Sequence, residues 1–434
     1  MKLLIPFLIA TFFFKNLHCQ NLKIIRDAET ENLLTDLSKI LTKDTHLEGE
    51  NLKFYLDNKD YINAFVTPDK HFFFTKELLL KSEMIDDIAG VLSHEIGHLV
   101  GGHFINREKM TKKSAMMSIL SSILAVGAIA GGAPAAGSAL LMGGQHLTSA
   151  RALAFSRSQE HLADQTAIRL MNNNGFSLKG LINIFEKLQN NERLKKINPY
   201  FLTHPLSSER IKNIKLNIKK GQKIKDFSSF NERFSLIKAK FNGYFLSEDQ
   251  ITSIYPENNI QKYYALVFNN YRKGKVRKSI EQIRKCIEYN NGNPYFYEIL
   301  GQIYFEQGDF DNAIKSFIEA IRINPKEKSF ELFLAKSLYH SKTNLNYKKS
   351  INLLDKYIKN DDFPVDAWHY LGLNYGKLKK LDLSSYAFAE KYLLVNQLDN
   401  ATIHINRAKQ LSKNTVLLNK LSDLEYQINK RKSK

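Results

Sequence analysis

Residues 93–98 read SHEIGH and place His94 and His98 four residues apart in a stretch with helical hydrophobic periodicity. Side chains four apart lie one turn above the other on the same helix face, so both imidazoles can bind one tetrahedral Zn²⁺. Glu95 lies one residue further round the helix, where its carboxylate reaches a water beside the metal. This HExxH pattern is typical of zinc peptidases, and two surface histidines on an ordinary helix are the alternative.

A catalytic zinc site needs one more protein ligand besides the two histidines. A histidine six residues after His98 would be the metzincin solution, but that position is Phe104 and the nearby His103 comes one residue early. Glu160 and Asp164 offer the other solution, because they lie four apart on a later, strongly helical stretch. One carboxylate can bind the metal while the other orients a ligand histidine. Two solvated acids on a helix face are the alternative.

His204 and Arg210 follow in the segment THPLSSER at 203–210. Pro205 fixes a turn after the histidine, and the helix expected next carries Arg210, so both side chains can point back at the metal cleft. As a hydrogen-bond donor, His204 would stabilise a tetrahedral oxyanion, with Arg210 helping it or bracing the acidic ligands. As a fourth zinc ligand, His204 would displace the catalytic water and hold a protease off until the loop moves. We favour the fourth ligand, and a loop histidine packed beside the proline is the alternative.

The sequence patterns around these groups predict a mainly α domain with a small sheet, whose elements must position them. Helical periodicity at 33–41 predicts an opening helix, and residues 53–74 contain short β-like runs split by turn residues, which predict a small antiparallel sheet. One of these strands carries Asn63, Ala64 and Phe65. We expect it to be an exposed edge that offers backbone hydrogen bonds to an extended peptide substrate. A buried structural strand is the alternative.

Together these blocks resemble a known family, the gluzincin metallopeptidases of the CAAX prenyl protease type, and most of all its periplasmic β-barrel assembly-enhancing proteases. The matching pieces are NAF at 63–65, SHEIGH at 93–98 with His103, SR at 156–157 with Glu160 and Asp164, and THP at 203–205 with Arg210. The resemblance implies that His94, His98 and Glu160 bind one Zn²⁺ per chain and that Glu95 is the general base. The sequence departs from the family at 68–70, where PDK stands in place of a frequent Pro-Gly-Gly turn.

Residues 114–144, between the two metal-binding blocks, carry no charged side chain and are apolar enough to suggest a membrane span. GGAP at 131–134 breaks this stretch near its middle, which leaves halves too short to span, and both flanks must return to one metal site. We therefore predict a hairpin that dips into a membrane surface or forms a lid over the cleft. Buried core helices and a true span are the alternatives. Nearby lysines at 109, 112 and 113 suit anionic lipid headgroups, and so a peripheral membrane contact.

Residues 259–434 repeat with a period of about 34 residues, which predicts a tetratricopeptide α-solenoid with a concave binding face. The clearest repeat, from 293 to 325, has a Leu-Gly pair, aromatic residues and a closing proline at the expected positions. Cys286 takes a position where the preceding repeat requires a small buried residue. Residues 20–220 are then the metallopeptidase domain, and 221–258 are a connector, marked by a change to Lys- and Asn-rich sequence after about residue 216 and by Gly221 and Pro256.

The composition and the first residues indicate an exported globular protein. The 434 residues carry a net charge of +19, yet no nucleic-acid motif appears, so we predict no nucleic-acid partner. Residues 1–19 place Lys2 before a short apolar run, as a signal peptide does. His18 stands where a lipoprotein signal would have a small residue, which disfavours lipidation of Cys19. Only Cys286 remains in the mature chain, and export without disulfides indicates the periplasm of a Gram-negative bacterium.

Two functions fit these features. The favoured one is an exported zinc endopeptidase whose repeats recruit substrates or an assembly machine. By resemblance, its substrates would be unfolded or misassembled outer-membrane β-barrel proteins, its partner the outer-membrane assembly machinery, and it would have a chaperone-like role. The alternative is a non-catalytic or latched repeat scaffold or chaperone in envelope assembly. The intact Glu95 favours the enzyme.

Overall fold

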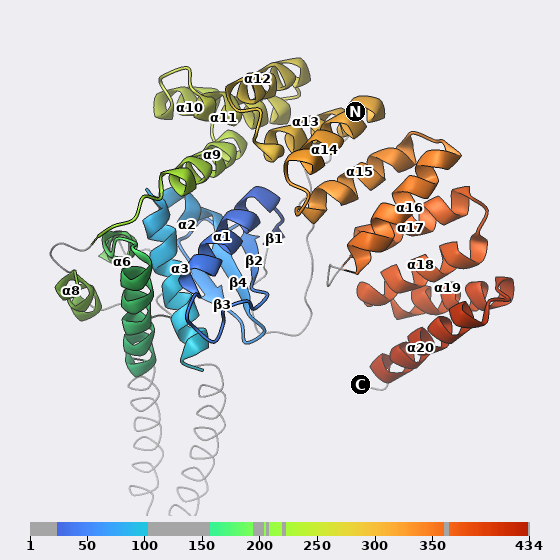
Figure 1. Ribbon diagram of the computed structural model, residues 1–434, viewed down its shortest axis with the longest axis horizontal. Helices are drawn as coiled ribbons and strands as arrows, with labels where there is room; N and C mark the ends of the chain where they lie inside the picture. The colour runs from blue at the N-terminus through green and yellow to red at the C-terminus, as the bar shows by residue number, and fades with distance from the viewer. Residues whose placement is uncertain are drawn as a thin grey trace, which may run out of the picture. The chain divides into compact units, whose positions relative to one another are not determined.

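The computed structural model describes residues 24–102, 157–193, 204, 208–218, 223–359 and 364–432. The chain divides into two compact units, Met1–Phe245 and Leu246–Lys434. Figure 1 shows a small sheet among the helices of the first unit, and helices alone in the second. The predicted signal peptide at 1–19, His103 and the apolar stretch at 114–144 lie outside the described residues.

Four short strands form the sheet of the first unit: β1 (Ile24–Ile25), β2 (Lys53–Asp57), β3 (Ala64–Val66) and β4 (His71–Thr75). Their order in the sheet is β1-β2-β4-β3. β1 pairs antiparallel with β2, and β3 pairs antiparallel with β4, but β2 and β4 run parallel. This pairing corrects the expectation of a purely antiparallel sheet, since the sheet is mixed.

The parallel pair arises because β4 takes a central place. It is a strongly apolar strand, and Phe72 and Phe74 are fully buried. The segment 58–63 carries the chain past this place to the edge strand β3, and a tight turn returns it, so β4 runs in the same direction as β2. In that turn Thr67 N donates to His71 O at 2.9 Å, and Lys70 has a φ of 63°. A glycine would adopt this left-handed conformation without steric cost.

The helices described in the first unit are α1 (Ala28–Leu41), α2 (Lys76–Lys81), α3 (Ile85–Val100), a helix over 157–174, α6 (Lys179–Arg193), α8 (Ser208–Leu216) and α9 (Ser228–Phe245). The predicted opening helix is α1, and its buried leucines join the strands, α3, α6 and α9 in one hydrophobic core. The helix expected to carry the SHEIGH motif is α3, and it runs through the centre of that core.

Two glycines allow neighbouring helices to approach α3 closely. A Cβ at Gly90 would lie 2.8 Å from the Cα of Leu181 in α6. A Cβ at Gly97 would lie 2.8 Å from the Cα of Ala163 in the helix over 157–174. Both separations are shorter than real Cβ contacts, so any larger residue would push these helices away from α3. The second contact sets how close the helix with the predicted acidic ligand comes to the histidines.

A buried lysine fixes α9 onto the beginning of α1. Lys240 Nζ lies 2.6 Å from Asp27 Oδ2 and 2.6 Å from Glu29 Oε2. The side chains of Lys240 and Glu29 are each only 4% exposed. Asp27 is also the N-cap of α1, where its side chain accepts a hydrogen bond from Thr30 N. Because both partners of Lys240 lie at the start of α1, α9 belongs structurally to the first unit.

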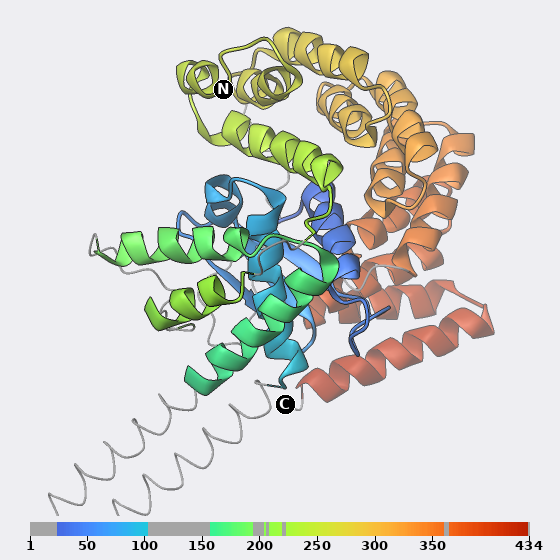
Figure 2. The ribbon, with the colours of Figure 1, turned by 60° about the vertical axis from the view of Figure 1, so that its left-hand side comes forward.

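The second unit contains helices only: α10 (Glu248–Ile254), α11 (Ile260–Arg272), α12 (Val276–Tyr289), α13 (Pro294–Glu306), α14 (Phe310–Ile323), α15 (Lys328–His340), α16 (Asn344–Ile358), α17 (Val365–Lys377), α18 (Leu381–Leu394), α19 (Leu398–Leu411) and α20 (Thr415–Lys432). Figure 2 shows the pairs from α11 onward following one another in a stack. Gly301 faces the ring of Phe317, and Gly372 faces the ring of Phe388, as small residues must where paired helices touch. Cys286 is fully buried in α12.

The mainly α fold class, with a small sheet followed by helical repeats, is confirmed. The division after Phe245 falls inside the segment 221–258 that was expected to be a connector. Within that segment α9 packs on α1, α2 and α3, whereas α10 packs on α11. Among the described residues, no helix combines the length and the apolar character needed to cross a bilayer.

Candidate metal centre

The first turn of α3 is held by side chains from other elements. Its N-cap, Met84, makes no side-chain capping bond, and Ile85 N instead donates to Asn231 Oδ1 of α9 at 2.8 Å. Asp86 Oδ1 accepts a hydrogen bond of 2.6 Å from Ser177 N, and Asp87 Oδ2 accepts one of 2.7 Å from Asn183 Nδ2 of α6. The positive end of the helix dipole also stabilises carboxylates in the first turn of a helix. These bonds fix the helix on which the candidate ligands lie.

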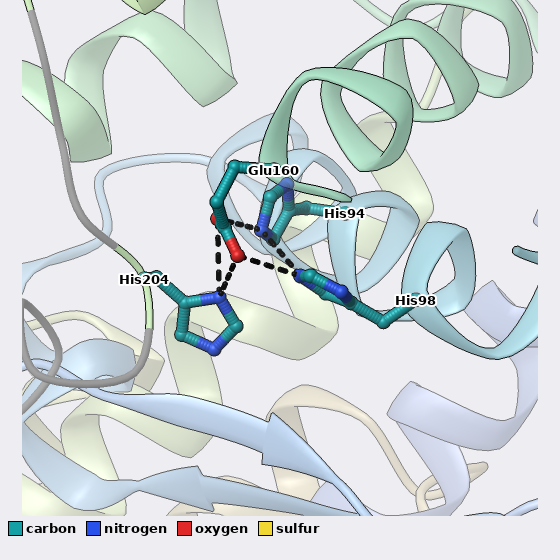
Figure 3. A group of neighbouring side chains, drawn as sticks. All are labelled: His94, His98, Glu160 and His204. Carbon is teal, nitrogen blue, oxygen red and sulfur yellow. Dashed lines mark hydrogen bonds and ion pairs between the residues drawn. The ribbon is translucent and has the colours of Figure 1, made fainter. Parts of the chain in front are cut away.

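His94, His98, Glu160 and His204 form a buried group whose potential ligand atoms all lie within 4.8 Å of one another. Figure 3 shows the four side chains pointing toward a common centre. His94 Nε2 and His98 Nε2 are 3.2 Å apart, and they lie 3.3 and 3.4 Å from the two oxygens of Glu160. His204 Nδ1 lies 3.2 Å from each oxygen of Glu160.

These spacings fit a metal ion. Zinc bonds of about 2.0–2.2 Å to nitrogen and oxygen place tetrahedral ligand atoms roughly 3.3–3.5 Å apart. The separations of 3.2–3.4 Å between the imidazole nitrogens and the carboxylate oxygens of the group lie close to that range. The donor set of imidazoles and one carboxylate is also the set that zinc peptidases use. The residues therefore fit the metal that the sequence predicts.

Glu95 lies beside this group and is 1% exposed. Its Oε1 atom has no hydrogen-bond partner among the described residues, and it lies 3.7 Å from His204 Nε2. A buried carboxylate oxygen without such a partner is costly unless it serves a ligand or a reaction. Glu95 is thus placed as a base beside the ligands rather than as one of them.

Asp164 and Arg210 surround the ligands. Asp164 Oδ1 lies 3.0 Å from His94 Nδ1, the ring nitrogen that faces away from the common centre. Arg210 Nε and Nη2 donate to the two oxygens of Asp164 at 2.7 and 2.8 Å, and Nη1 lies 3.0 Å from Glu160 Oε2. A carboxylate on the outer nitrogen of a ligand histidine fixes the tautomer and orientation of the ring. Arg210, in turn, holds both carboxylates in place.

Phe185 of α6 also belongs to the site, although no sequence motif points to it. The guanidinium of Arg210 lies over its ring at 4.8 Å, and the His94 ring meets it edge-on with centroids 6.1 Å apart. Phe185 is fully buried, so it looks like any other core residue of an amphipathic helix. Only the packing of α6 against α3 and α8 reveals that it supports the arginine and a ligand.

The electrostatics of the group follow from burial and from its carboxylates. Burial opposes the charge of Glu160, but His204 and His94 hold the pKa of this carboxyl far below its usual range. Burial likewise opposes a charged His94, but hydrogen bonds to Asp164 and Glu160 raise its pKa to about 9. Burial raises the pKa of Glu95. The site therefore combines ionised carboxylates that attract a cation with a base whose proton affinity is increased.

The strand predicted to bind substrate lies at the edge of the sheet. β3 pairs only with β4 in the described sheet, and it packs against α3. The strand begins at Ala64, and Asn63 just before it is tied to Thr75, whose Oγ1 accepts from Asn63 N at 2.9 Å. Ala64 is buried, while Phe65 is half-buried and stacks on Phe73 with ring centroids 4.7 Å apart. Among the described strands, β3 thus has a neighbour on one side only.

Comparison with known proteins matches residues 27–217 to peptidase family M48 and residues 294–327 to the tetratricopeptide repeat. The Beta-barrel assembly-enhancing protease of Escherichia coli (strain K12) is 25% identical over 393 residues, which cover 87% of this chain and 78% of that protein. The mitochondrial metalloendopeptidase OMA1 of Saccharomyces cerevisiae is 29% identical over 185 residues, covering 42% of this chain and 50% of that protein.

Among solved structures, MamA from Desulfovibrio magneticus RS-1 matches with 15% identity and a TM-score of 0.32, covering 39% of this chain and 97% of that one. The two family matches and the assembly-enhancing protease confirm the resemblance that the sequence motifs indicated.

Proposed function

We propose that the chain is an exported zinc enzyme of outer-membrane protein quality control. Residues 27–217 match peptidase family M48 and residues 294–327 match the tetratricopeptide repeat, and the chain is accordingly a metalloendopeptidase. The observation that carries this proposal is the convergence of His94, His98 and Glu160 beside Glu95 Oε1, which has no hydrogen-bond partner among the described residues. His94, His98 and Glu160 would hold one Zn²⁺. When bound, the zinc supplies Lewis-acid polarisation of the scissile carbonyl and a lowered pKa of the attacking water.

Glu95 acts as the general base. It takes the proton of the attacking water and returns it to the leaving amine, and the raised pKa caused by its burial makes the carboxylate a better proton acceptor near neutral pH. Asp164 orients the His94 ring, and Arg210 holds Asp164 and Glu160. Arg210 supports the ligands through these contacts, and this favours the bracing role over direct help to an oxyanion.

His204 is proposed as a reversible fourth ligand. Its Nδ1 atom lies among the other donor atoms, so four protein ligands can close the tetrahedron and leave no position for water. Such an enzyme is held inactive until residue 204 moves away. The competing role is oxyanion stabilisation by the other ring nitrogen, Nε2, which lies 3.7 Å from Glu95 Oε1 on the side of the proposed general base.

The substrate is proposed to add as an extended strand beside β3. Backbone hydrogen bonds along residues 63–65 would select extended conformation over side-chain identity, which suits unfolded proteins. The relative from Escherichia coli is described as enhancing β-barrel assembly, and this supports unfolded or misassembled outer-membrane proteins as substrates. The repeats would then contact the assembly machinery or its clients in the periplasm. We propose a chaperone-like role for the protein in the same compartment. Peripheral membrane contact through 114–144 remains part of the proposal.

The test uses the mature chain from Gln20 to Lys434 and its Glu95→Gln variant. Zinc content is measured by mass spectrometry, and cleavage is followed on an outer-membrane β-barrel protein presented unfolded and folded. We expect about one zinc per chain in both proteins, cleavage of the unfolded substrate by wild type, and a loss of about 10²–10⁴-fold in Glu95→Gln because an amide accepts no proton. Full activity of the zinc-loaded variant would contradict the proposed mechanism, and a wild-type chain without zinc would contradict the proposed metal.

A further inference from the structure

The second unit contains a groove between α14 and α16, the second helices of two consecutive helix pairs. It encloses about 650 Å³. Leu334 and Leu338 of α15 and Leu353 of α16 form its floor, and the first two belong to the hydrophobic core of the repeat. Ile318 of α14 stands on its wall and is 48% exposed. The apolar surface thus continues from the core of the repeat into solvent.

The groove coincides with a local departure from the regular repeat. In two other helix pairs a serine of the second helix donates to a carbonyl of the first across 12 residues, as Ser279 does to Val267 O. In the pair α15 and α16 the same bond, from Ser350 to Ala335 O, spans 15 residues. The additional residues lie in the first turn of α16, because Ser350 is the seventh residue of that helix, whereas Ser279 and Ser384 are the fourth residues of α12 and α18. The first turns of α16 line the groove. The groove is therefore a feature of this repeat's own sequence.

Two lysines face the groove from opposite walls. Lys315 of α14 and Lys349 of α16 line it, both are exposed, and neither forms an ion pair with any described residue. Asp311 is the single acidic residue among the lining side chains, and Asn346 and Asn352 are neutral. The rim is therefore net positive, and it complements acidic side chains on either flank of an apolar occupant.

The walls favour a helix as the occupant. α14 lines the groove with 311, 314, 315 and 318, and α16 with 346, 349, 352 and 353, so each wall offers one helix face over about two turns, or roughly 11 Å. The backbone groups of both walls are bonded within their own helices. An extended peptide would find no main-chain partners there, whereas a helix brings its backbone hydrogen bonds with it.

We propose that this groove binds an amphipathic helix of a partner protein, with apolar residues at i, i+4 and i+7 on the leucine floor and acidic residues flanking them to meet Lys315 and Lys349. Burial of the exposed face of Ile318 contributes apolar area, and the lysines set the orientation and the salt dependence. This binding lies in the second unit and is independent of the metal centre, so it stands whether or not the peptidase proposal does.

The probe is a fluorescent peptide of about four helical turns with leucines at i, i+4 and i+7 and glutamates flanking them. Its binding is measured by fluorescence anisotropy on the full mature chain carrying Glu95→Gln, which prevents cleavage. Lys315→Glu with Lys349→Glu should weaken binding about tenfold and reverse its salt dependence. Lys348→Glu is the matched control, because Lys348 is an exposed neighbour that does not line the groove, and it should leave binding unchanged.

A second pair of variants tests the apolar contact. Ile318→Asp should weaken binding several-fold, whereas Ile403→Asp, at an exposed isoleucine of α19, should not. Circular dichroism confirms that each variant keeps its helices. Equal affinity of the Lys348→Glu control and the double variant Lys315→Glu, Lys349→Glu would overturn the proposal, as would absence of binding or tighter binding of a lysine-flanked peptide. Tighter binding of the same peptide with a central proline would also overturn it, because such a result indicates an extended occupant. A dimer that Ile318→Asp disrupts would do so too, because it indicates a second copy of this chain.

Discussion

At the scale of single residues, Glu160 is the carboxylate that lies beside all three histidines of the metal site. Its two oxygens lie 3.2–3.4 Å from ring nitrogens of His94, His98 and His204, and 3.0 Å from Arg210 Nη1. Its charge is retained despite burial, because His204 and His94 hold its pKa far below the ordinary value. A neutral side chain of the same shape would keep the packing and lose the charge.

Glu160→Gln should therefore weaken zinc binding by about tenfold to a hundredfold, since a charged ligand is replaced by a neutral amide. Zinc occupancy is measured by competition with a chelator at matched free metal. His161→Ala is the control, because His161 is an exposed neighbour on the same helix and its loss should not change zinc affinity. An unchanged affinity in Glu160→Gln would identify another acid as the ligand, with Asp164 the next candidate.

His204→Ala distinguishes the two roles proposed for this histidine. If it is a latch, the variant keeps zinc through three protein ligands and cleaves unfolded proteins faster than wild type, because a position for water is now open. If it stabilises an oxyanion, the variant keeps zinc and loses about 10²–10³-fold in turnover. Zinc content and turnover are measured together on one unfolded substrate. Turnover equal to wild type would exclude both roles.

Much of the site could be predicted from the sequence because helical spacing alone brings its main parts together. Residues four apart lie on the same face of a helix, and this spacing relates His94 to His98 and Glu160 to Asp164. Spacing could not show that Arg210 contacts both acids, because that depends on how α8 packs against the helix over 157–174. It could not identify Phe185 either, because a buried phenylalanine on an amphipathic helix carries no signal of its neighbours.

At the scale of elements, α9 lies beyond the predicted end of the peptidase domain at residue 220, yet it contributes to the core of the first unit. Phe234, Ile237 and Phe241 lie in the main core, and Lys240 reaches the start of α1. Its sequence, rich in polar residues, resembled a connector, because its burial depends on tertiary contacts that no local pattern reports. The parallel pairing of β2 and β4 escaped prediction for the same reason, since the order of strands in a sheet depends on tertiary packing that the sequence of one strand does not report.

Lys240→Met should destabilise the first unit by about 3–5 kcal/mol, because it leaves Asp27 and Glu29 buried without their cation. Calorimetry of the mature chain should show a lower melting temperature for the transition that releases zinc. Restoring neutrality with Asp27→Asn and Glu29→Gln in the same chain should recover most of the loss, because asparagine still caps α1. A Lys240→Met chain as stable as wild type would mean that the cluster is solvated.

At the scale of the whole molecule, the two units differ in what holds them together. The first has a single core that joins sheet and helices, and the second has several smaller clusters along its stack. A stack in which each helix pair contacts mainly its neighbours can be removed without taking core residues from the first unit. Truncation after Phe245 should therefore separate the peptidase activity from the recruitment that we propose for the repeats.

A chain from Gln20 to Phe245 should fold, bind zinc and cleave loosely unfolded substrates, yet fail to replace the full chain in cells, because the proposed recruiting surfaces lie in the second unit.

A chain ending at 220, the boundary expected from sequence, is the informative comparison. It lacks α9 and with it Lys240 and the buried aromatic residues of that helix, so its melting temperature should fall steeply or the protein should not fold. Zinc content, thermal melting and complementation of a deletion strain are measured for both. Complementation by the chain ending at Phe245 would remove recruitment from the function of the repeats, whereas equal stability of the two truncations would show that α9 adds nothing to the peptidase unit.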